Sequence, residues 1–313
     1  MLSDIWKKIR NTEQTGDSGT EPERLSDEIT QPLPVMEVNK ANSGNVILGI
    51  RAAARTDSGR VRRTNEDDVL LALPESNESV LPTIGIVAIA DGMGGHDKGE
   101  VASRTAIEAT INHLQNNPFF TEGHFLRQNL SDDDVVNVVR EAVQTANRAV
   151  YRTKVEQSTD MGTTLVLALI LRGKSYIANV GDSRAYIVRD RAIRRITEDH
   201  SLVERMIAAG QITEIEARRH PQRNLIFRSL GTEPVVEIDM FVEPLRSGDR
   251  LLLCSDGLNS MVSDDVIADI VSHESDVDRA CRLLIRAAND AGGADNISVA
   301  LVEMVALEDQ TSM

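Results

Sequence analysis

Four aspartates in this sequence stand where an apolar run begins or ends, and they are Asp91, Asp182, Asp256 and Asp295. Aspartate favours turns, so any one of them fits a simple turn. Four together are harder to explain in this way, because strand ends of one sheet can converge and converging carboxylates repel unless a cation neutralises them. Oxygen ligands suit hard ions such as Mg²⁺ or Mn²⁺, whereas zinc needs His or Cys at ligand spacing. The pattern therefore predicts a divalent cation site, which the Gly92 carbonyl can also face because glycine permits close backbone approach.

A second polar segment, residues 56–68, places arginines beside two acids. The guanidinium of Arg62 can hold a phosphate through a bidentate fork, and Glu66 and Asp67 add further carboxylates. Residue types alone favour the alternative of a solvated, charged turn, and both interpretations are open at this point.

The elements that must position these residues are short strands and a few long helices. Hairpins are predicted where Gly173 and Lys174, and then Asp190 and Arg191, separate two β-like runs, and residues 235–242 alternate as a strand does. Helical patterns cover residues 99–115, 132–155, 263–273 and 276–291. The second has Ser131 as a candidate N-cap and one apolar stripe that should pack on a sheet. These elements predict an α+β fold in which helices cover mainly antiparallel sheets.

Length, charge and composition limit the possible functions. The chain has 313 residues and a formal net charge of −15, which argues against a dedicated nucleic-acid binder and in favour of a metal cation as a partner. No apolar run approaches the ~20 residues that cross a bilayer, so no membrane span is expected. The first ten residues lack the apolar core of a secretory signal, and Cys254 and Cys281 have no framework spacing. A cytoplasmic location is therefore expected.

The two ends of the chain are expected to lie outside the folded domain. Residues 1–44 are predicted to form a disordered N-terminal tail, because residues 11–44 are rich in Glu, Ser, Thr and Pro. Residues 45–306 form the predicted domain, and residues 307–313 a C-terminal tail. Near the start, the spacing of Leu2, Ile5, Trp6 and Ile9 fits either a docking helix or a frayed terminus, and the frayed terminus is favoured.

Seven motifs, taken in order, resemble those of the Mg²⁺/Mn²⁺-dependent type 2C serine/threonine protein phosphatases, in particular their bacterial branch. They are GRVRRTNED at 59–67, DGMGGHDKGE at 91–100, MGTT at 161–164, VGDSR at 180–184, DHSL at 199–202, SDGL at 255–258 and ADNIS at 294–298. Together they cover about residues 46–304, and their order makes the set far more specific than any single motif. The resemblance implies a four-layer α-β-β-α sandwich with two cations, Mn²⁺ or Mg²⁺, at one end of the paired sheets.

The resemblance also implies which residues hold those two tightly bound cations. By position in the motifs, Asp91 bridges both cations and the Gly92 carbonyl binds the second. Asp256 and Asp295 hold the first. On residue types alone, Asp182 also fits a structural turn in which it caps backbone amides or pairs with Arg184. The resemblance instead implies a third, weaker cation near Asp182, because the bacterial branch places one beside this motif.

The remaining motif positions concern the phosphate and the proton transfers. Arg62 is implied to hold the phosphate, and Glu66 and Asp67 to act mainly through metal-bound water. Some family members carry a histidine two residues after the metal-bridging aspartate, but this chain has Met93 there. The role is not transferred to His96, so the general acid is unassigned, and a metal-bound water is an equal candidate.

The implied activity is hydrolysis of phosphoserine and phosphothreonine in proteins by direct attack of a metal-bridging water. The expected partners are proteins phosphorylated by a serine/threonine kinase, and the chain is expected to act as a monomer in signal transduction. Residues 199–232, rich in arginine, are implied to form a flap beside the site. One alternative is a partner-switching phosphatase dedicated to one regulatory protein. Another is a regulatory module that has lost catalysis, which is disfavoured because every acid and the arginine of the motifs are present.

Overall fold

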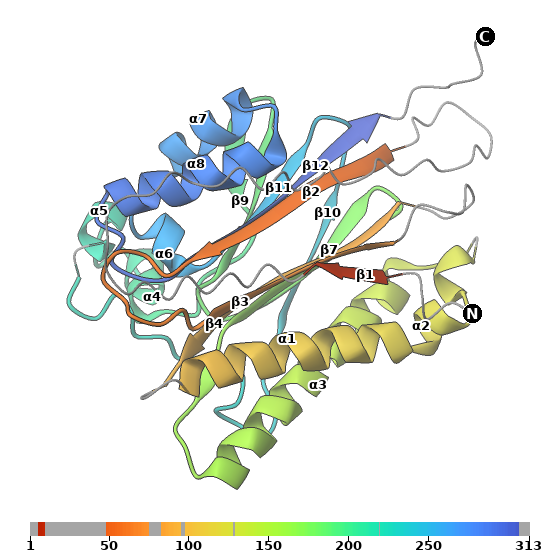
Figure 1. Ribbon diagram of the computed structural model, residues 1–313, viewed down its shortest axis with the longest axis horizontal. Helices are drawn as coiled ribbons and strands as arrows, with labels where there is room; N and C mark the ends of the chain where they lie inside the picture. The colour runs from red at the N-terminus through yellow and green to blue at the C-terminus, as the bar shows by residue number, and fades with distance from the viewer. Residues whose placement is uncertain are drawn as a thin grey trace, which may run out of the picture.

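Two antiparallel sheets pack face to face in the computed structural model, which describes residues 6–9, 48–74, 83–94, 98–127, 129–218 and 220–306 (Figure 1). The first sheet has the order β1-β3-β4-β6-β7-β10, with β5 joined to β4, and its strands are β1 (Trp6–Ile9), β3 (Asp67–Pro74), β4 (Ile84–Met93), β5 (Gly162–Thr163), β6 (Leu165–Leu171), β7 (Lys174–Val180) and β10 (Asp239–Pro244). The second has the order β2-β12-β11-β8-β9, with β2 (Leu48–Asp57), β8 (Arg184–Arg189), β9 (Ala192–Arg195), β11 (Arg250–Cys254) and β12 (Ile297–Ala306).

Helices cover the outer face of each sheet (Figure 1). On the first sheet lie α1 (Lys98–Asn116) and α3 (Asp132–Gln157), with α2 (Pro118–Thr121) and η1 (His124–Leu126) between them in the chain. On the second lie α7 (Asp264–His273) and α8 (Val277–Asp290). The short helices α4 (Leu202–Ala208), α5 (Glu214–Ala217) and α6 (Asp256–Asn259) gather at one end of the sandwich. The predicted four-layer α-β-β-α architecture is confirmed.

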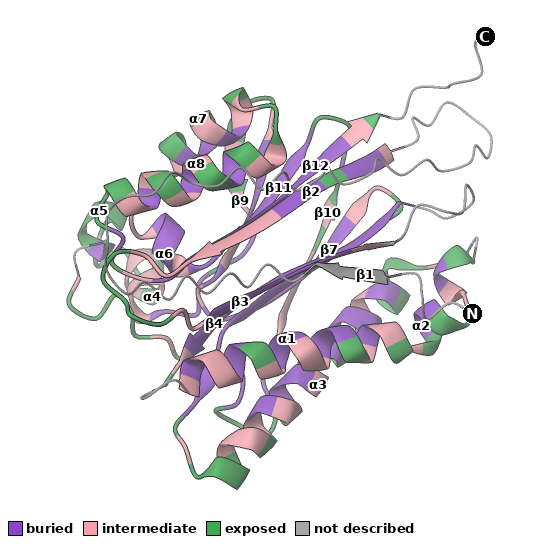
Figure 2. Cartoon of the chain, viewed as in Figure 1, coloured by how far each residue is buried: buried purple, intermediate pink, exposed green. Residues whose placement is uncertain are grey.

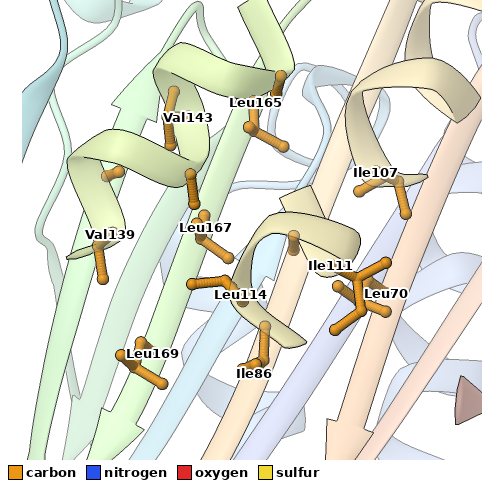
Figure 3. Close-up of a cluster of buried hydrophobic side chains, with 14 of the residues drawn as sticks. Leu70, Ile86, Ile107, Ile111, Leu114, Val139, Val143, Leu165, Leu167 and Leu169 are labelled. Carbon is orange, nitrogen blue, oxygen red and sulfur yellow. The ribbon is translucent and has the colours of Figure 1, made fainter. Parts of the chain in front are cut away.

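Three apolar layers hold the sandwich together, and Figure 2 shows inner strands such as β3, β4 and β11 largely buried. Strand β4 is buried on both of its faces, which explains why its sequence is continuously apolar. Ile86 and Ala88 face the helical layer, whereas Val87 and Ile89 face the other sheet, because successive side chains of a strand point to opposite faces. Figure 3 shows the helical layer, where Ile86 lies with side chains from α1 and α3.

Local sequence signals set most element boundaries. Ser131 caps α3 in a reciprocal capping box with Asp134, as its sequence predicts. The hairpin turn between β8 and β9 falls at Asp190 and Arg191, where both φ angles are positive (51° and 66°), as two-residue hairpin turns of this class require. The turn between β6 and β7 lies one residue earlier than predicted, at Arg172 and Gly173, because Leu171 pairs with Lys174.

The strand predicted over residues 235–242 is wrong at its start, since β10 begins at Asp239. The residues before Asp239 are hydrogen-bonded to α3 instead of pairing in the sheet. Gln144 donates to the Val236 carbonyl at 2.5 Å, and Asn147 donates to the Glu233 carbonyl at 3.0 Å. These side-chain bonds take carbonyl groups that a strand ladder would otherwise use, so the alternating pattern does not produce a strand there.

The N-terminal prediction is also corrected. Trp6–Ile9 form neither a helix nor a frayed end but strand β1, antiparallel to β3, with Trp6 opposite Pro74 and Ile9 opposite Leu71. Without β1, this stretch of β3 would be an unpaired sheet edge, and its free backbone groups explain why extended pairing prevails over helical spacing. The described residues do not include the rest of the expected tails, residues 1–5, 10–44 and 307–313, or residues 45–47 of the expected domain. Among the described helices, none combines the length and the apolar character that crossing a membrane requires.

Candidate active site

The acids singled out in the sequence converge at one end of the paired sheets. Asp67 opens β3 and stands directly opposite Asp91, near the end of β4, in the strand register. Asp256 begins α6 immediately after β11, and Asp295 lies two residues before β12. Asp182 lies in the short connection between β7 and β8. The antiparallel arrangement therefore brings together residues that lie up to 228 positions apart.

Two glycines let three segments meet beside these acids. The Gly92 amide donates to the Glu66 carbonyl at 3.1 Å. A Cβ at Gly92 would lie 2.1 Å from the Gly99 carbonyl oxygen, and a Cβ at Gly99 would lie 2.7 Å from Glu66 Oε1. Neither position can carry a side chain without a clash, which explains why both positions of the DGMGGHDKGE motif are glycine. The start of α1 thus packs against the Glu66 carboxylate.

The backbone of Asp91 is held by the MGTT segment. The Thr164 amide donates to the Asp91 carbonyl at 2.8 Å, and the Asp91 amide donates to Thr164 Oγ1 at 3.0 Å. Thr163 Oγ1 donates to the same carbonyl at 2.9 Å. These bonds fix where the Asp91 side chain leaves the sheet, a role that the motif signals but that sequence reasoning did not assign.

Asn296 organises the loop that carries Arg62, and sequence reasoning missed this role. Its Nδ2 donates to the carbonyl oxygens of Ser58 at 3.1 Å and Thr64 at 2.9 Å, while its Oδ1 accepts the Glu66 amide at 2.9 Å. The side chain is buried. The available signal was its place beside Asp295 in the ADNIS motif.

Asp67 is the most buried of the converging acids. Burial raises the pKa of Asp67 from 3.8 to about 7; the charges of Asp256 and Asp295 act in the same direction, and hydrogen bonds from Ser298 and Ser255 oppose them. Ser255 Oγ donates to Asp67 Oδ2 at 2.8 Å. Asp67 Oδ1 is buried without a hydrogen-bond partner among the described residues. A buried carboxylate oxygen with no donor is one that a ligand would satisfy.

The other acids raise one another's pKa values. Burial, then Asp67 and Asp256, raise the pKa of Asp91 well above its usual value. Burial and the Asp295 charge raise the pKa of Asp256 to about 6, against the opposing charge of Arg62. Burial and Asp256 likewise raise the pKa of Asp182 well above its usual value. Such mutual repulsion is what a bound cation relieves.

Across the described ranges, no three His, Cys, Asp or Glu side chains are close enough to form a complete ligand set for an ion. Part of the negative charge is neutralised by Arg62, whose Nη2 donates to Asp295 Oδ2 at 2.8 Å. This hydrogen bond raises the pKa of Arg62, and so do the charges of Glu66 and Asp91. The predicted phosphate-binding arginine thus lies at the rim of the acid cluster.

Asp182 is not paired with Arg184, although the sequence suggested that pairing as its simplest role. Arg184 instead donates from Nε and Nη2 to Asp199, at 2.9 and 2.7 Å, and from Nη1 to the Tyr186 hydroxyl at 2.9 Å. Within the described part of the chain, no ion pair joins Arg184 to Asp182. Arg184 therefore acts on Asp182 only as a nearby charge that lowers the pKa of Asp182, against the larger effects of burial and of the Asp256 and Asp199 charges.

Residues 199–232, predicted to lie beside the site, contribute α4 and α5 at the same end of the sandwich. Hydrogen bonds link the two ends of this segment near Asp182. The Gly181 amide donates to His200 Nδ1 at 3.0 Å, His200 Nε2 lies 3.0 Å from Asp239 Oδ2, and Arg228 Nη1 donates to Asp239 Oδ1 at 2.8 Å. Arg228 is therefore structural. The segment's other predicted basic residues include Arg218 and Arg223, both exposed, whereas Arg219 is outside the described residues.

Four further residues bear on the chemistry. Met93 ends β4 at the position where some relatives carry histidine, and His96 lies outside the described residues. Cys254 and Cys281 are buried free thiols, and burial raises the pKa of each to about 12. Neither thiol can supply a thiolate nucleophile near neutral pH.

Comparison with known proteins gives consistent relatives. The family model "Protein phosphatase 2C" matches residues 58–302. The chain is 37% identical over 256 residues to "Serine/threonine phosphatase stp" of Listeria welshimeri. The aligned region covers 81% of this chain and 96% of that protein. The crystal structure of the Mycobacterium tuberculosis serine/threonine phosphatase PstP/Ppp is similar, with a TM-score of 0.68, 35% identity, and coverage of 82% of this chain and 99% of that one. A crystal structure of the PstP catalytic domain in complex with 2 manganese ions matches with a TM-score of 0.67, 35% identity and the same coverage.

Proposed function

This chain belongs to the protein phosphatase 2C family, and on that premise we propose that it hydrolyses phosphoserine and phosphothreonine in proteins with the help of two divalent cations, Mn²⁺ or Mg²⁺. The observation that carries the proposal is the cluster of carboxylates that raise one another's pKa values beside Arg62. The related PstP catalytic domain has been crystallised in complex with 2 manganese ions. Oxygen-only ligands favour hard cations of this kind.

The residues present suit such cations. Asp91, the Gly92 carbonyl, Asp256 and Asp295 are the residues that would hold them. The unpartnered Oδ1 of Asp67 supports this assignment, because a buried carboxylate oxygen is costly unless something bonds to it. Glu66 and Asp67 are proposed to act mainly through water.

Each side chain then has a task in hydrolysis. When bound, two divalent cations lower the pKa of a water molecule and offset the negative charge of the phosphate. Arg62 is proposed to orient the phosphate through its guanidinium, which Asp295 holds at the rim. Ser255 keeps Asp67 ionisable by donating to Oδ2. Water is the proposed nucleophile, in a direct attack without a covalent intermediate, and the two inert thiols exclude a cysteine nucleophile.

We also propose a third, weaker cation at Asp182. Its carboxylate faces Asp256 and lacks a paired arginine, because Arg184 is engaged by Asp199. A single carboxylate shared with an occupied site should bind weakly, since the number of charged ligands sets the affinity for hard cations.

Substrate and cellular setting are part of the same proposal. We propose that the chain acts as a monomer in the cytoplasm on proteins phosphorylated by a serine/threonine kinase, and so in signal transduction. Two free buried cysteines, with no disulfide, are consistent with a reducing compartment. A phosphatase dedicated to one regulatory protein is the second candidate.

The test is turnover by the purified chain. With Mn²⁺ it should release phosphate from p-nitrophenyl phosphate and from phosphoserine and phosphothreonine peptides, and with EDTA it should release none. No turnover of any substrate in Mn²⁺ would refute the proposal and favour a catalytically inactive module. Turnover of one phosphoprotein but no peptides would favour the dedicated phosphatase. A phosphoproteome comparison of a deletion strain with its parent would then identify the substrates.

A further inference from the structure

The short connection that carries Asp182 packs against the MGTT segment. Gly181, the residue before Asp182, has a φ angle of 113°, and a Cβ there would lie 2.6 Å from the Thr164 Cβ. Ser183, the residue after Asp182, has its hydroxyl oxygen 2.7 Å from Thr164 Oγ1. Thr164 also accepts the Asp91 amide. Thr164 therefore contacts both neighbours of Asp182 and links them to the strand end that carries Asp91.

The same connection is also bonded to His200. The His200 amide donates to the Gly181 carbonyl at 2.9 Å, and the Gly181 amide donates to His200 Nδ1 at 3.0 Å. His200 thus holds the peptide groups on both sides of Gly181, and the second of them leads directly to Asp182. Glycine has the most freely rotating backbone, so the direction of a side chain that follows it depends on contacts of this kind.

The contacts of His200 determine where its ring proton lies. A backbone amide can only donate, so Nδ1 is the unprotonated nitrogen and Nε2 carries the proton. Nε2 then donates to Asp239 Oδ2, at 3.0 Å, and Arg228 Nη1 donates to Asp239 Oδ1 at 2.8 Å. Nε2 and Arg228 Nη1 are also 2.9 Å apart, and the Asp239 carboxylate accepts from both of these donors. His200 is buried, and burial lowers the pKa of His200, which favours the neutral ring.

His200 also begins the pairing at the base of segment 199–232. The Phe227 amide donates to the His200 carbonyl at 2.9 Å, and the Leu202 amide donates to the Leu225 carbonyl at 2.9 Å. The two ends of the segment therefore run alongside each other from His200 onward. His200 is the residue at which this segment joins the connection that carries Asp182.

We propose that His200 is a positioning residue for Asp182, whose neutral imidazole fixes the Gly181 backbone so that the Asp182 carboxylate is oriented for the weak third cation. Only the bond to Nδ1 depends on the imidazole, since the other bond uses the His200 backbone, so a substitution tests this bond by itself. If His200 served only to fill the base of the segment, its loss would lower stability without changing the response to Mn²⁺. The inference rests on the proposed third cation and extends that site to a residue that acts on it through Gly181.

Three variants separate positioning from packing. His200→Leu removes the acceptor, whereas His200→Asn keeps one, because an asparagine Oδ1 can take the place of Nδ1. His113→Leu is the matched control, since His113 is a partly buried imidazole that contacts Asn117 and Thr145, on the helices that cover the first sheet. The Mn²⁺ concentration for half-maximal p-nitrophenyl phosphate turnover should rise about tenfold in His200→Leu, the effect of one lost hydrogen bond. It should return toward the wild-type value in His200→Asn and stay there in His113→Leu.

Two measurements in EDTA test the same bond without catalysis. Heteronuclear NMR of the wild-type histidine rings should show His200 protonated at Nε2 and unprotonated at Nδ1. Hydrogen exchange at the Gly181 amide should be about tenfold faster in His200→Leu than in the wild type or in His200→Asn, because the amide loses its acceptor. A proton on Nδ1 in the wild type, or equal exchange in all variants, would overturn the inference. Faster exchange in His200→Leu with a wild-type Mn²⁺ requirement would also overturn it, because His200 would then be structural only.

Calorimetry with Mn²⁺ keeps this test separate from the proposed function. Two tight ions should bind to every variant, and a further weak ion should lose affinity in His200→Leu and in Asp182→Asn but not in His113→Leu. At saturating Mn²⁺, His200→Leu should turn over faster than Asp182→Asn, because it retains the carboxylate. A weak ion that binds equally to Asp182→Asn would overturn the inference. No turnover by the wild type would refute the proposed function, and the weak-ion affinity and Gly181 exchange would still decide the role of His200.

Discussion

Arg62 Nη2 donates to Asp295 Oδ2 at 2.8 Å, across 233 positions of the sequence. The two residues have different proposed partners, since Arg62 is proposed to bind phosphate and Asp295 a cation. Both side chains are partly exposed, with 47% and 26% of their surfaces accessible. The ion pair is therefore loose enough to be shared with ligands, and it contributes little to stability by itself.

Replacing Arg62 should weaken the use of the phosphate substrate without weakening cation binding. Arg62→Ala should lower kcat/KM for phosphopeptides by about 10- to 100-fold, the range that loss of a charge-assisted hydrogen bond implies. Mn²⁺ affinity measured by calorimetry should stay equal or rise, because a competing cation beside Asp295 is removed. Arg62→Lys should recover only part of the activity, since lysine cannot form the planar fork. Weaker Mn²⁺ binding in Arg62→Ala would contradict this relationship.

Replacing the central acids should remove catalysis without unfolding the protein. Asp91→Asn and Asp256→Asn should each lose most p-nitrophenyl phosphate turnover, and EDTA should abolish turnover by the parent. In EDTA, each variant should unfold thermally at or above the temperature of the parent, because one member of a repelling cluster has become neutral. Full turnover in EDTA would exclude the two-cation mechanism. A large fall in the unfolding temperature would mean that these acids have a structural role.

The cation-free protein should lose stability as pH rises. The pKa of Asp67 is about 7 in the folded protein and 3.8 as an unperturbed side chain, so the unfolded chain releases this proton first. Between pH ~4 and ~7 the folded state then binds more protons than the unfolded state, and the free energy of unfolding falls with pH. Asp256, with a pKa of about 6, adds to the same decline.

Urea unfolding in EDTA at a series of pH values measures this dependence. Asp67→Asn should make the decline shallower, because one of the groups with a raised pKa is removed. Saturating Mn²⁺ should also flatten it, since a bound cation offsets the charge. Stability that rises through this pH range in EDTA would show that the acids are not desolvated as described.

Asp182 should tune catalysis without holding the two tight cations. Asp182→Asn should lower turnover and raise the Mn²⁺ concentration needed for full activity, because a weak site loses its unshared carboxylate. Calorimetry should still detect two tight ions. Loss of all bound metal would place Asp182 among the primary ligands, and wild-type turnover across a Mn²⁺ titration would remove it from the site.

Deleting residues 1–44 should leave catalysis intact. Strand β1 pairs with residues 71–74 of β3, whereas Asp67 stands at the other end of that strand. The deletion removes one edge strand, so the unfolding temperature should fall slightly while p-nitrophenyl phosphate turnover with Mn²⁺ is unchanged. A truncated chain that does not fold would show that β1 belongs to the essential core.

Local chemistry allowed much of this protein to be predicted before any contact was known. The Ser131 cap, the positive φ angles at Asp190 and Arg191, and the apolar stripes of the long helices depend on residues within a few positions of each other. The ordered motifs added the family, and with it the expected architecture. The residue roles at Asp91 and Arg62 came from that resemblance and remain predictions.

Strand pairing and packing decided the rest, because they join residues that no local pattern relates. The alternation of apolar and polar residues before Asp239 predicted a strand, but a hydrogen bond from a side chain of α3 takes a backbone carbonyl of that segment. Proximity in sequence suggested that Arg184 pairs with Asp182, yet Asp199 takes its guanidinium because the packed chain brings that carboxylate into bidentate reach. The hydrogen bonds from Asn296 to the loop that carries Arg62, 230 or more positions earlier in the chain, exist only once the sheets have closed on each other. The sequence by itself determined which acids and arginines are present and which short elements carry them, whereas the tertiary structure determined their partners, since a partner depends on long-range register and burial.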